Sequence, residues 1–224
     1  MNDELKLALK SLSFWSDLNE KEKNVLLENA YIEKFSKGNQ ISYTEEECKG
    51  PIVILKGQIR TYLISEEGRE VTVYRLHKGD FCVLSASCIL DSIGFDVNIE
   101  AIEKTEILVI PPVVFKALQK KNPRLEIFLL ETVNERFSDV MWTMQQILFM
   151  GVDKRVAIYL WDEFSKNGKS EIHITHDELA RYIGSVREVV TRILNHFTEE
   201  GIVSLSRGKI TIEDKEKLKT MYVT

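Results

Sequence analysis

Four polar side chains near the C-terminal end of the chain have the chemistry needed to read DNA bases. They are Arg187, Glu188, Thr191 and Arg192. An arginine can donate to O6 and N7 of guanine, a glutamate can accept from N4 of cytosine, and a threonine can contact a thymine methyl group or a phosphate. The alternative is that Arg187 and Glu188 form only a surface ion pair, which is the better interpretation of an isolated Arg-Glu pair. The elements that hold these residues decide between the two.

Residues 175–194 predict the two helices of a helix-turn-helix. The run Thr175-His176-Asp177-Glu178 matches a capping box, so a helix is expected to begin there. Gly184 ends that helix, and a second one begins at once at Ser185. In a helix-turn-helix the second helix lies in the major groove of DNA. We therefore expect the four polar side chains to contact bases.

Two short strands after the second helix predict a wing. Gly201–Leu205 and Lys209–Ile212 read as strands, and Ser206-Arg207-Gly208 reads as the turn between them. Basic and hydroxyl side chains at the helix starts and in the wing suit phosphate contacts, which position a protein on DNA without reading sequence. The further candidate DNA-binding residues are Thr175, His176, Ser185, Arg207 and Lys209.

A long helix is expected from about Pro123 to Met150, and it carries a heptad pattern. Its seam is apolar at all positions except Asn134, and the spacing alternates strictly between three and four residues. A buried Asn is costly unless it meets its symmetry mate, and that pairing fixes the register of a two-stranded coiled coil. The pattern favours a parallel dimer over a helix packed only on its own domain. The predicted seam residues are Ile127, Leu130, Asn134, Phe137, Met141, Met144 and Leu148.

Residues 1–28 read as helical, and residues 31–110 alternate between short apolar runs and turns that contain Gly, such as Lys56-Gly57 and Glu67-Gly68. Short strands at this spacing predict a β-roll. The predicted fold class is α+β. It comprises an N-terminal double-stranded β-helix (jelly-roll-like) sensor domain at 1–122, a dimerisation helix at 123–150 and a winged helix-turn-helix DNA-binding domain at 151–224.

Several of these residues resemble the signature of the CRP/FNR family of transcription regulators. In the helix-turn-helix they are Leu179-Ala180, Gly184, Arg187-Glu188, Val190, Arg192 and Gly201-Ile202. Gly57, Gly68 and Gly79-Asp80-Phe81 are similar to the turns of the family's cyclic-nucleotide-binding β-roll. The resemblance covers nearly the whole chain and implies an effector-sensing roll, a dimer helix and a DNA-binding domain, with RNA polymerase as a partner. The Arg-Glu-x-x-x-Arg pattern resembles that of members that read a TGTGA-like half-site.

The chain departs from the family where nucleotide-sensing members bind phosphate. Those members carry a Glu for the ribose and an Arg-Ser pair for the phosphate, and an Arg is needed there because it grips phosphate with two donors. Here the Glu position falls on Leu84, and the chain has no Arg between Arg75 and Arg124. Cyclic AMP is therefore not expected to bind, and no cofactor is predicted. The candidate effector-pocket residues are Leu84, Ser85, Ser87, Cys88, Val140 and Met141.

Other chemistries fit the sequence less well. Cys82 and Cys88 leave a redox-responsive regulator as an alternative, against the simpler interpretation of small buried residues. An iron–sulfur cluster needs four ligands, and the chain has only three cysteines. His77 is the only histidine before residue 173, so a metal-dependent oxygenase is excluded and no enzyme activity is expected. A ligand-binding regulatory module without a DNA function also remains an alternative.

The charge is unevenly distributed, as expected for a chain with an acidic N-terminal half and a DNA-binding C-terminal half. The net charge is −5 for the whole chain, whereas the residues from Gly151 onward contain 12 Lys and Arg and 12 Asp and Glu. No apolar run approaches the roughly 20 residues that a membrane helix needs. We therefore expect no membrane helix. The three cysteines have no regular spacing, so a disulfide framework is not expected and the predicted location is the cytoplasm.

Overall fold

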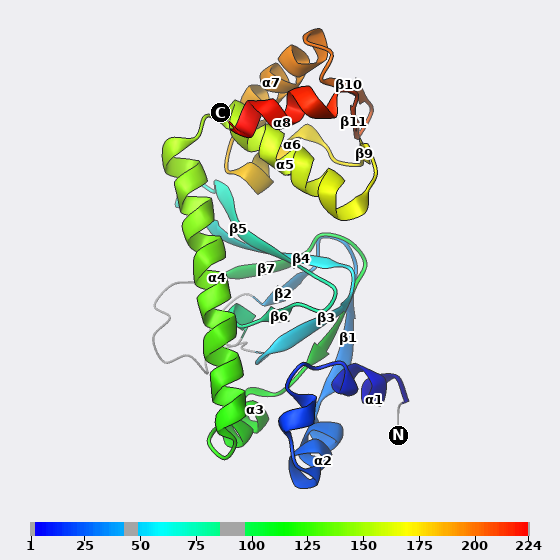
Figure 1. Cartoon of the computed structure of the whole chain (residues 1–224), viewed down its shortest axis with the longest axis vertical. Coiled ribbons are helices and arrows are strands. Elements are labelled where there is room, and N and C mark those ends of the chain that lie inside the picture. Colours follow the sequence, from blue (N-terminus) through cyan, green and yellow to red (C-terminus); the bar gives the residue numbers. More distant parts are fainter. Residues whose placement is uncertain (1–2, 43–48, 86–96, 224) are drawn as a thin grey trace. The chain divides into compact units, whose positions relative to one another are not determined.

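The computed structural model describes residues 3–42, 49–85 and 97–223, drawn in Figure 1. The chain divides into two compact units, one made of Met1–Leu63 with Val73–Val140 and the other of Ile64–Thr72 with Met141–Thr224. The long helix α4 (Pro123–Phe149) contributes residues to both units. Within the described residues, none of the helices is both long and apolar enough to span a lipid bilayer.

Two four-stranded sheets form the β-roll, whose strand residues belong to the first unit apart from residues 64 and 70–72. Their strand orders are β1-β8-β3-β6 and β2-β7-β4-β5. The pairs β1–β8, β3–β8, β3–β6, β2–β7 and β4–β7 are antiparallel. The short strands predicted within residues 31–110 are confirmed for the described residues of that range. The strands are β1 (Tyr31–Phe35), β2 (Gln40–Ser42), β3 (Ile52–Lys56), β4 (Gln58–Ile64), β5 (Glu70–His77), β6 (Phe81–Cys82), β7 (Asn98–Ala101) and β8 (Thr105–Val109).

The apolar side chains of β3 pack into two cores, one on each face of its sheet. Side chains alternate between the faces of a strand, so Ile52 and Ile54 enter the core between the sheets while Val53 enters a second core. Strand β8 repeats the pattern, with Leu108 on the side of Val53. A strand covered on both faces shows a continuous apolar run instead of an alternating one. We call the core between the sheets, which includes Ile59, Tyr74, Cys82 and Ile99, the roll core.

Helices cover the second core on the outer side of the β1-β8-β3-β6 sheet. The expectation of helix over residues 1–28 is partly wrong, because residues 11–19 interrupt it. Asn19 starts a new helix by a capping box: its side chain accepts from the backbone N–H of Glu22 at 3.0 Å, and Glu22 accepts from that of Asn19 at 2.9 Å. The helical elements of this unit besides α4 are α1 (Asp3–Lys10), the 3-10 turn η1 (Trp15–Asp17), α2 (Glu20–Asn29) and α3 (Pro112–Gln119).

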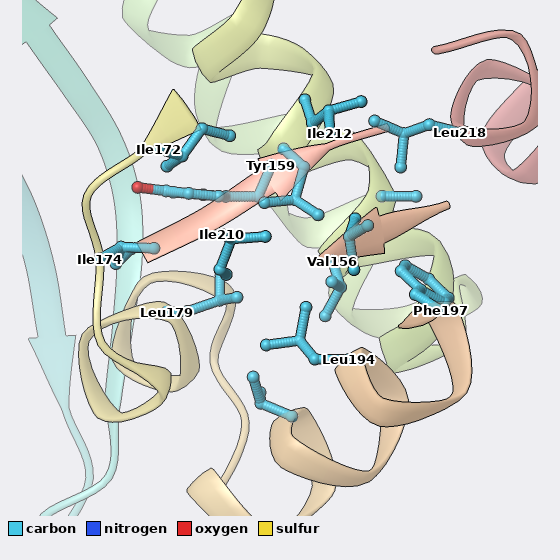
Figure 2. Close-up of a cluster of buried hydrophobic side chains, with 14 of the residues drawn as sticks. Val156, Tyr159, Ile172, Ile174, Leu179, Leu194, Phe197, Ile210, Ile212 and Leu218 are labelled. Carbon is cyan, nitrogen blue, oxygen red and sulfur yellow. The ribbon is translucent and has the colours of Figure 1, made fainter. Parts of the chain in front are cut away.

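The second unit contains a winged helix-turn-helix with its own core (Figure 2). Side chains from α5, α6 and α7 meet those of a three-stranded sheet ordered β10-β11-β9. Val156, Leu179 and Leu194 are each fully buried in this core. The elements are α5 (Val152–Asn167), β9 (Glu171–Ile172), α6 (His176–Ile183), α7 (Arg187–Glu199), β10 (Val203–Ser206), β11 (Lys209–Ile212) and α8 (Lys215–Val223).

The turn between α6 and α7 is slightly longer than predicted. Gly184 adopts the left-handed conformation with φ of 66°, and the N–H of Ser185 bonds to the carbonyl of Ala180 at 2.8 Å. Val186 is the N-cap, so α7 begins at Arg187 and not at Ser185. A left-handed residue after a helix is strained for side chains with a Cβ, which explains the Gly at this position.

Candidate DNA interface and effector pocket

Helix α7 has one face in the core of the second unit and one face exposed. Val190, Leu194 and Phe197 have exposed fractions of 0%. Arg187, Glu188 and Arg192 are exposed, and Thr191 is half-buried. The amphipathic pattern of α7 thus leaves the four candidate base-reading residues outside the core, on the helix that a helix-turn-helix inserts into the major groove.

Arg187 pairs with an acidic residue of α6 that the sequence analysis did not assign. Its Nη1 lies 3.2 Å from Oδ2 of Asp177, and the two side chains are 63% and 59% exposed. An exposed pair of this kind contributes little to stability, so releasing Arg187 costs little. Asp177 follows the N-cap by two positions, a place where acidic residues are common, so the sequence marked it only as part of a capping box.

His176 joins α6 to α7. Its Nδ1 lies 2.9 Å from Oγ1 of Thr191, within hydrogen-bonding distance. Burial, and to a lesser degree the positive charge of Arg187, lower the pKa of His176 below its usual value, while Asp177 acts in the opposite direction. This shift favours the neutral ring at pH 7, and the Thr191 hydroxyl has a hydrogen-bond partner in His176.

Acid is expected to weaken the second unit through His176. Because its pKa is lower in the folded chain than in the unfolded chain, the unfolded chain takes up the proton first as the pH falls below about 6.5. The stability that His176 contributes is present above that pH and is lost as the pH falls through its folded pKa. Urea unfolding at pH 7.5 and pH 5.5 should show a larger loss for the wild type than for His176→Gln. Equal losses in both would contradict this.

The wing is the hairpin β10–β11. Ser206 pairs with Lys209, and Arg207 and Gly208 form its exposed tip, with φ of 70° at Gly208. Nζ of Lys209 lies 2.7 Å from Oε1 of Glu171, so this candidate phosphate ligand is held by a carboxylate in the absence of DNA. The hydrogen bond from Lys209, and then its positive charge, lower the pKa of the Glu171 carboxyl.

The two remaining candidate DNA-contacting residues lie at the ends of α6. Thr175 is the N-cap of the predicted capping box: its Oγ1 accepts from the backbone N–H of Glu178 at 3.2 Å, and Oε2 of Glu178 accepts from the backbone N–H of Thr175 at 2.9 Å. Ser185 is half-buried in the turn. Thr175 thus caps the start of α6, and Ser185 lies in the turn that connects α6 to α7.

The candidate effector residues only partly converge. Leu84 and Val140 pack against the roll core, and the hydroxyl of the buried Ser85 donates to the carbonyl of Cys82 at 2.8 Å. Met141 is 46% exposed and does not belong to that cluster. The two remaining candidates, Ser87 and Cys88, lie outside the described residues.

A polar group beside the roll core was missed by the sequence analysis. Arg136 precedes Val140 by one helical turn, so both lie on the same face of α4. Its guanidinium is 5.6 Å from the ring centre of Tyr74 and pairs with Asp139 at 2.6 Å. Burial raises the pKa of Tyr74 well above its usual value. Because Arg136 comes from α4, the sequence of the β-strands, where the family carries its phosphate-binding Arg, does not reveal this cation.

Cys82 is fully buried, and this burial raises the pKa of its thiol. The thiolate is the reactive form of cysteine, so Cys82 has the properties of a structural residue. We expect iodoacetamide to leave Cys82 unmodified in the native chain and to modify it in urea, as read by peptide mass spectrometry. Native labelling as fast as labelling in urea would revive the redox hypothesis.

Among the residues that the structure describes, no group of three or more His, Cys, Asp or Glu is arranged to hold a metal ion.

Comparison with known proteins identifies both units. The Crp-like helix-turn-helix domain matches residues 154–221, and the cyclic nucleotide-binding domain matches residues 32–122. A solved structure from Eubacterium rectale, assigned to the CRP/FNR family of transcriptional regulators, is 43% identical. The match covers 96% of this chain and 100% of that one, with a TM-score of 0.91. The chain belongs to the CRP/FNR family. It is a transcription regulator of this type with a helix-turn-helix DNA-binding domain, and the family consists of regulators and not enzymes.

Two curated CRP/FNR relatives have names that describe different kinds of regulation. The cAMP-activated global transcriptional regulator Vfr of Pseudomonas aeruginosa is 23% identical over 84% of this chain and 91% of its own length. The fumarate and nitrate reduction regulatory protein of Yersinia pestis is 27% identical over 81% of this chain and 74% of its own length. The first name states an activating ligand and the second states only a regulated process, so membership of the CRP/FNR family leaves the effector of this chain unspecified.

Proposed function

We propose that this CRP/FNR regulator binds a palindromic promoter site as a homodimer, under the control of a small-molecule effector other than cyclic AMP. Residues 1–122 act as the sensor, residues 123–150 as the dimerisation helix and residues 151–224 as the DNA-binding domain. Binding at a promoter implies contact with RNA polymerase, and a chromosomal target implies a cytoplasmic protein.

The exposed apolar stripe along α4 is the observation that supports the proposed homodimer. Leu130, Phe137 and Leu148 are 61%, 62% and 64% exposed, and Asn134 is also exposed. Ile127, Met141 and Met144 complete the heptad seam, each 46% exposed. The opposite face of α4 buries Leu125 and Leu129 in its own unit. Large exposed apolar patches mark interaction surfaces, and a strict heptad repeat suits a second copy of the same helix.

DNA reading is assigned to α7, with support from α6 and the wing. Arg187 and Arg192 would contact guanines, and Glu188 a cytosine on the opposite strand. Thr191 would contact a neighbouring base or a phosphate. Phosphate contacts would come from the helix ends and the wing, where His176 keeps Nε2 available because Nδ1 is engaged by Thr191. The other proposed backbone-contacting residues are Thr175, Ser185, Arg207 and Lys209.

The effector is assigned to the roll core and the face of α4 beside it. Leu84 and Val140 pack there, and Tyr74 and Arg136 supply polar groups. Leu84 stands where nucleotide-sensing relatives carry a ribose-binding Glu, and Arg136 is already paired with Asp139. Calorimetry with cyclic AMP should therefore show no complex of micromolar or tighter affinity. A spectrum and mass analysis of the purified chain would identify a co-purifying effector.

A duplex with variable spacing tests the proposed binding mode. Two TGTGA-like half-sites placed one helical turn apart, about 10–11 base pairs centre to centre, should bind at least about 10³-fold more tightly than a scrambled duplex. Inserting about half a turn, roughly five base pairs, moves the second half-site to the opposite side of the helix. The advantage should then largely disappear. Equal affinity for both spacings would contradict binding by a symmetric dimer.

A further inference from the structure

Arg155, in the first turn of α5, has its guanidinium group beneath the turn of the helix-turn-helix. Nη1 lies 2.5 Å from the carbonyl oxygen of Ile183 and 3.5 Å from that of Gly184. The residue is only 9% exposed. Arg155 was not among the residues that the sequence pattern assigned to DNA binding.

The carbonyl groups at the end of α6 need a partner from outside their own helix. The last carbonyls of a helix have no intrahelical donor. Here the N–H groups of Gly184 and Ser185 both turn back to Ala180, and Arg155 supplies a donor to Ile183, the last residue of α6. A cation at this position also complements the negative end of the helix dipole. The hydrogen bond from the guanidinium of Arg155 therefore links the start of the turn to α5.

The turn leaves little room for alternative geometry. A Cβ placed on Gly184 would lie only 3.2 Å from Cγ2 of Val71, which is a tight contact, and 3.7 Å from Nη1 of Arg155, which is an ordinary one. Three residues, Gly184 to Val186, connect the two helices, so the backbone at Gly184 sets the angle at which α7 leaves α6. The contacts between Asp177 and Arg187 and between His176 and Thr191 both depend on that angle.

We propose that Arg155 is a positioning residue for DNA recognition, which fixes the helix-turn-helix turn and thereby sets base preference without touching DNA. The inference rests on the proposed function of α7 as the reading helix. A reader side chain must be held closely to make a bidentate contact with a base, whereas a phosphate contact tolerates more movement. Loosening the turn should therefore lower specific binding much more than non-specific binding.

Arg155→Met, which keeps the apolar stem and removes the donors, tests the proposal in the full chain. The readout is the ratio of affinities for the palindrome and for a scrambled duplex, measured on one sample so that any inactive fraction cancels. We expect this ratio to fall at least about tenfold, equivalent to about 1.4 kcal/mol. Arg155→Lys should recover most of it because an ammonium group can still donate to Ile183. If the Met variant does not fold, Arg155→Leu, which also has no donor, replaces it, with the same expected loss.

Val156→Ala is the matched control. Val156 is the next residue of α5, is fully buried in the same core, and its truncation lowers stability without removing a donor from the turn. It should keep the wild-type affinity ratio. The proposal is overturned if the Met or Leu variant keeps the wild-type ratio, or if Val156→Ala loses as much. A wild type that does not prefer the palindrome would instead contradict the proposed function.

Discussion

Arg187→Ala is expected to weaken binding to the palindrome by roughly 2–6 kcal/mol, which is roughly 1–3 kcal/mol for each half-site. Loss of a bidentate contact to guanine removes the hydrogen bonds that distinguish that base, so preference at one base pair of each half-site should relax. A panel of duplexes with single substitutions, titrated by fluorescence anisotropy, measures both effects. The ion pair with Asp177 is exposed and adds little to stability, so the fold should be unaffected.

Lys209→Ala is the control for this prediction, since Lys209 is assigned to phosphate and not to a base. It should weaken all duplexes alike and reduce the salt dependence of binding by about one phosphate contact per protomer. If Arg187→Ala also weakens all duplexes alike, with the base preference of the wild type intact, Arg187 does not read bases. The docking of α7 in the major groove would then have to be abandoned.

Phe137→Glu is expected to convert a dimer into monomers. Phe137 is 62% exposed on α4, so a charged side chain there leaves the fold of the protomer intact while it introduces like charges into the proposed seam. Each monomer would keep one half-site contact, and the gain from joining two contacts would be lost. Affinity for the palindrome should therefore fall on the order of 10²–10⁴-fold. Sedimentation at micromolar concentration measures the oligomeric state directly.

Asn134→Leu is the opposite change in the same seam. Removing the polar group should raise the thermal stability of the dimer or shift its oligomeric state, because the Asn specifies two strands at a cost in stability. A wild type that sediments as a monomer at micromolar concentration would show that the stripe on α4 serves another purpose.

The DNA-binding unit could largely be predicted from the sequence because its signals are local. A capping box, a left-handed Gly and a three-to-four-residue apolar spacing each depend on neighbouring residues, and the structure has all of them at α6 and α7. The strands of the β-roll were equally visible from apolar runs between turns that contain Gly. The prediction of helix over residues 1–28 is wrong for residues 11–19 because apolar residues such as Leu12 and Phe14 are buried in the core although they lie in an irregular segment.

What the sequence could not predict depends on residues that are distant in the chain. Arg155 reaches the carbonyl of Ile183 across 28 positions, and nothing in the local pattern of α5 indicates that bond. Arg136 comes from α4 to the ring of Tyr74, so an inspection of the β-roll alone misses the cation beside the roll core. Asp177 meets Arg187 only because the turn at Gly184 brings the two helices together.

Selection of bound DNA from a random pool by the wild-type full chain tests directly whether a dimer reads DNA bases through α7. A CRP/FNR dimer that reads bases through α7 should enrich a palindrome whose two half-sites lie about one helical turn apart. Guanines should be fixed at the positions assigned to Arg187 and Arg192. Recovery of a motif without two-fold symmetry, or of no motif at all at a salt concentration that suppresses phosphate binding, would contradict the account.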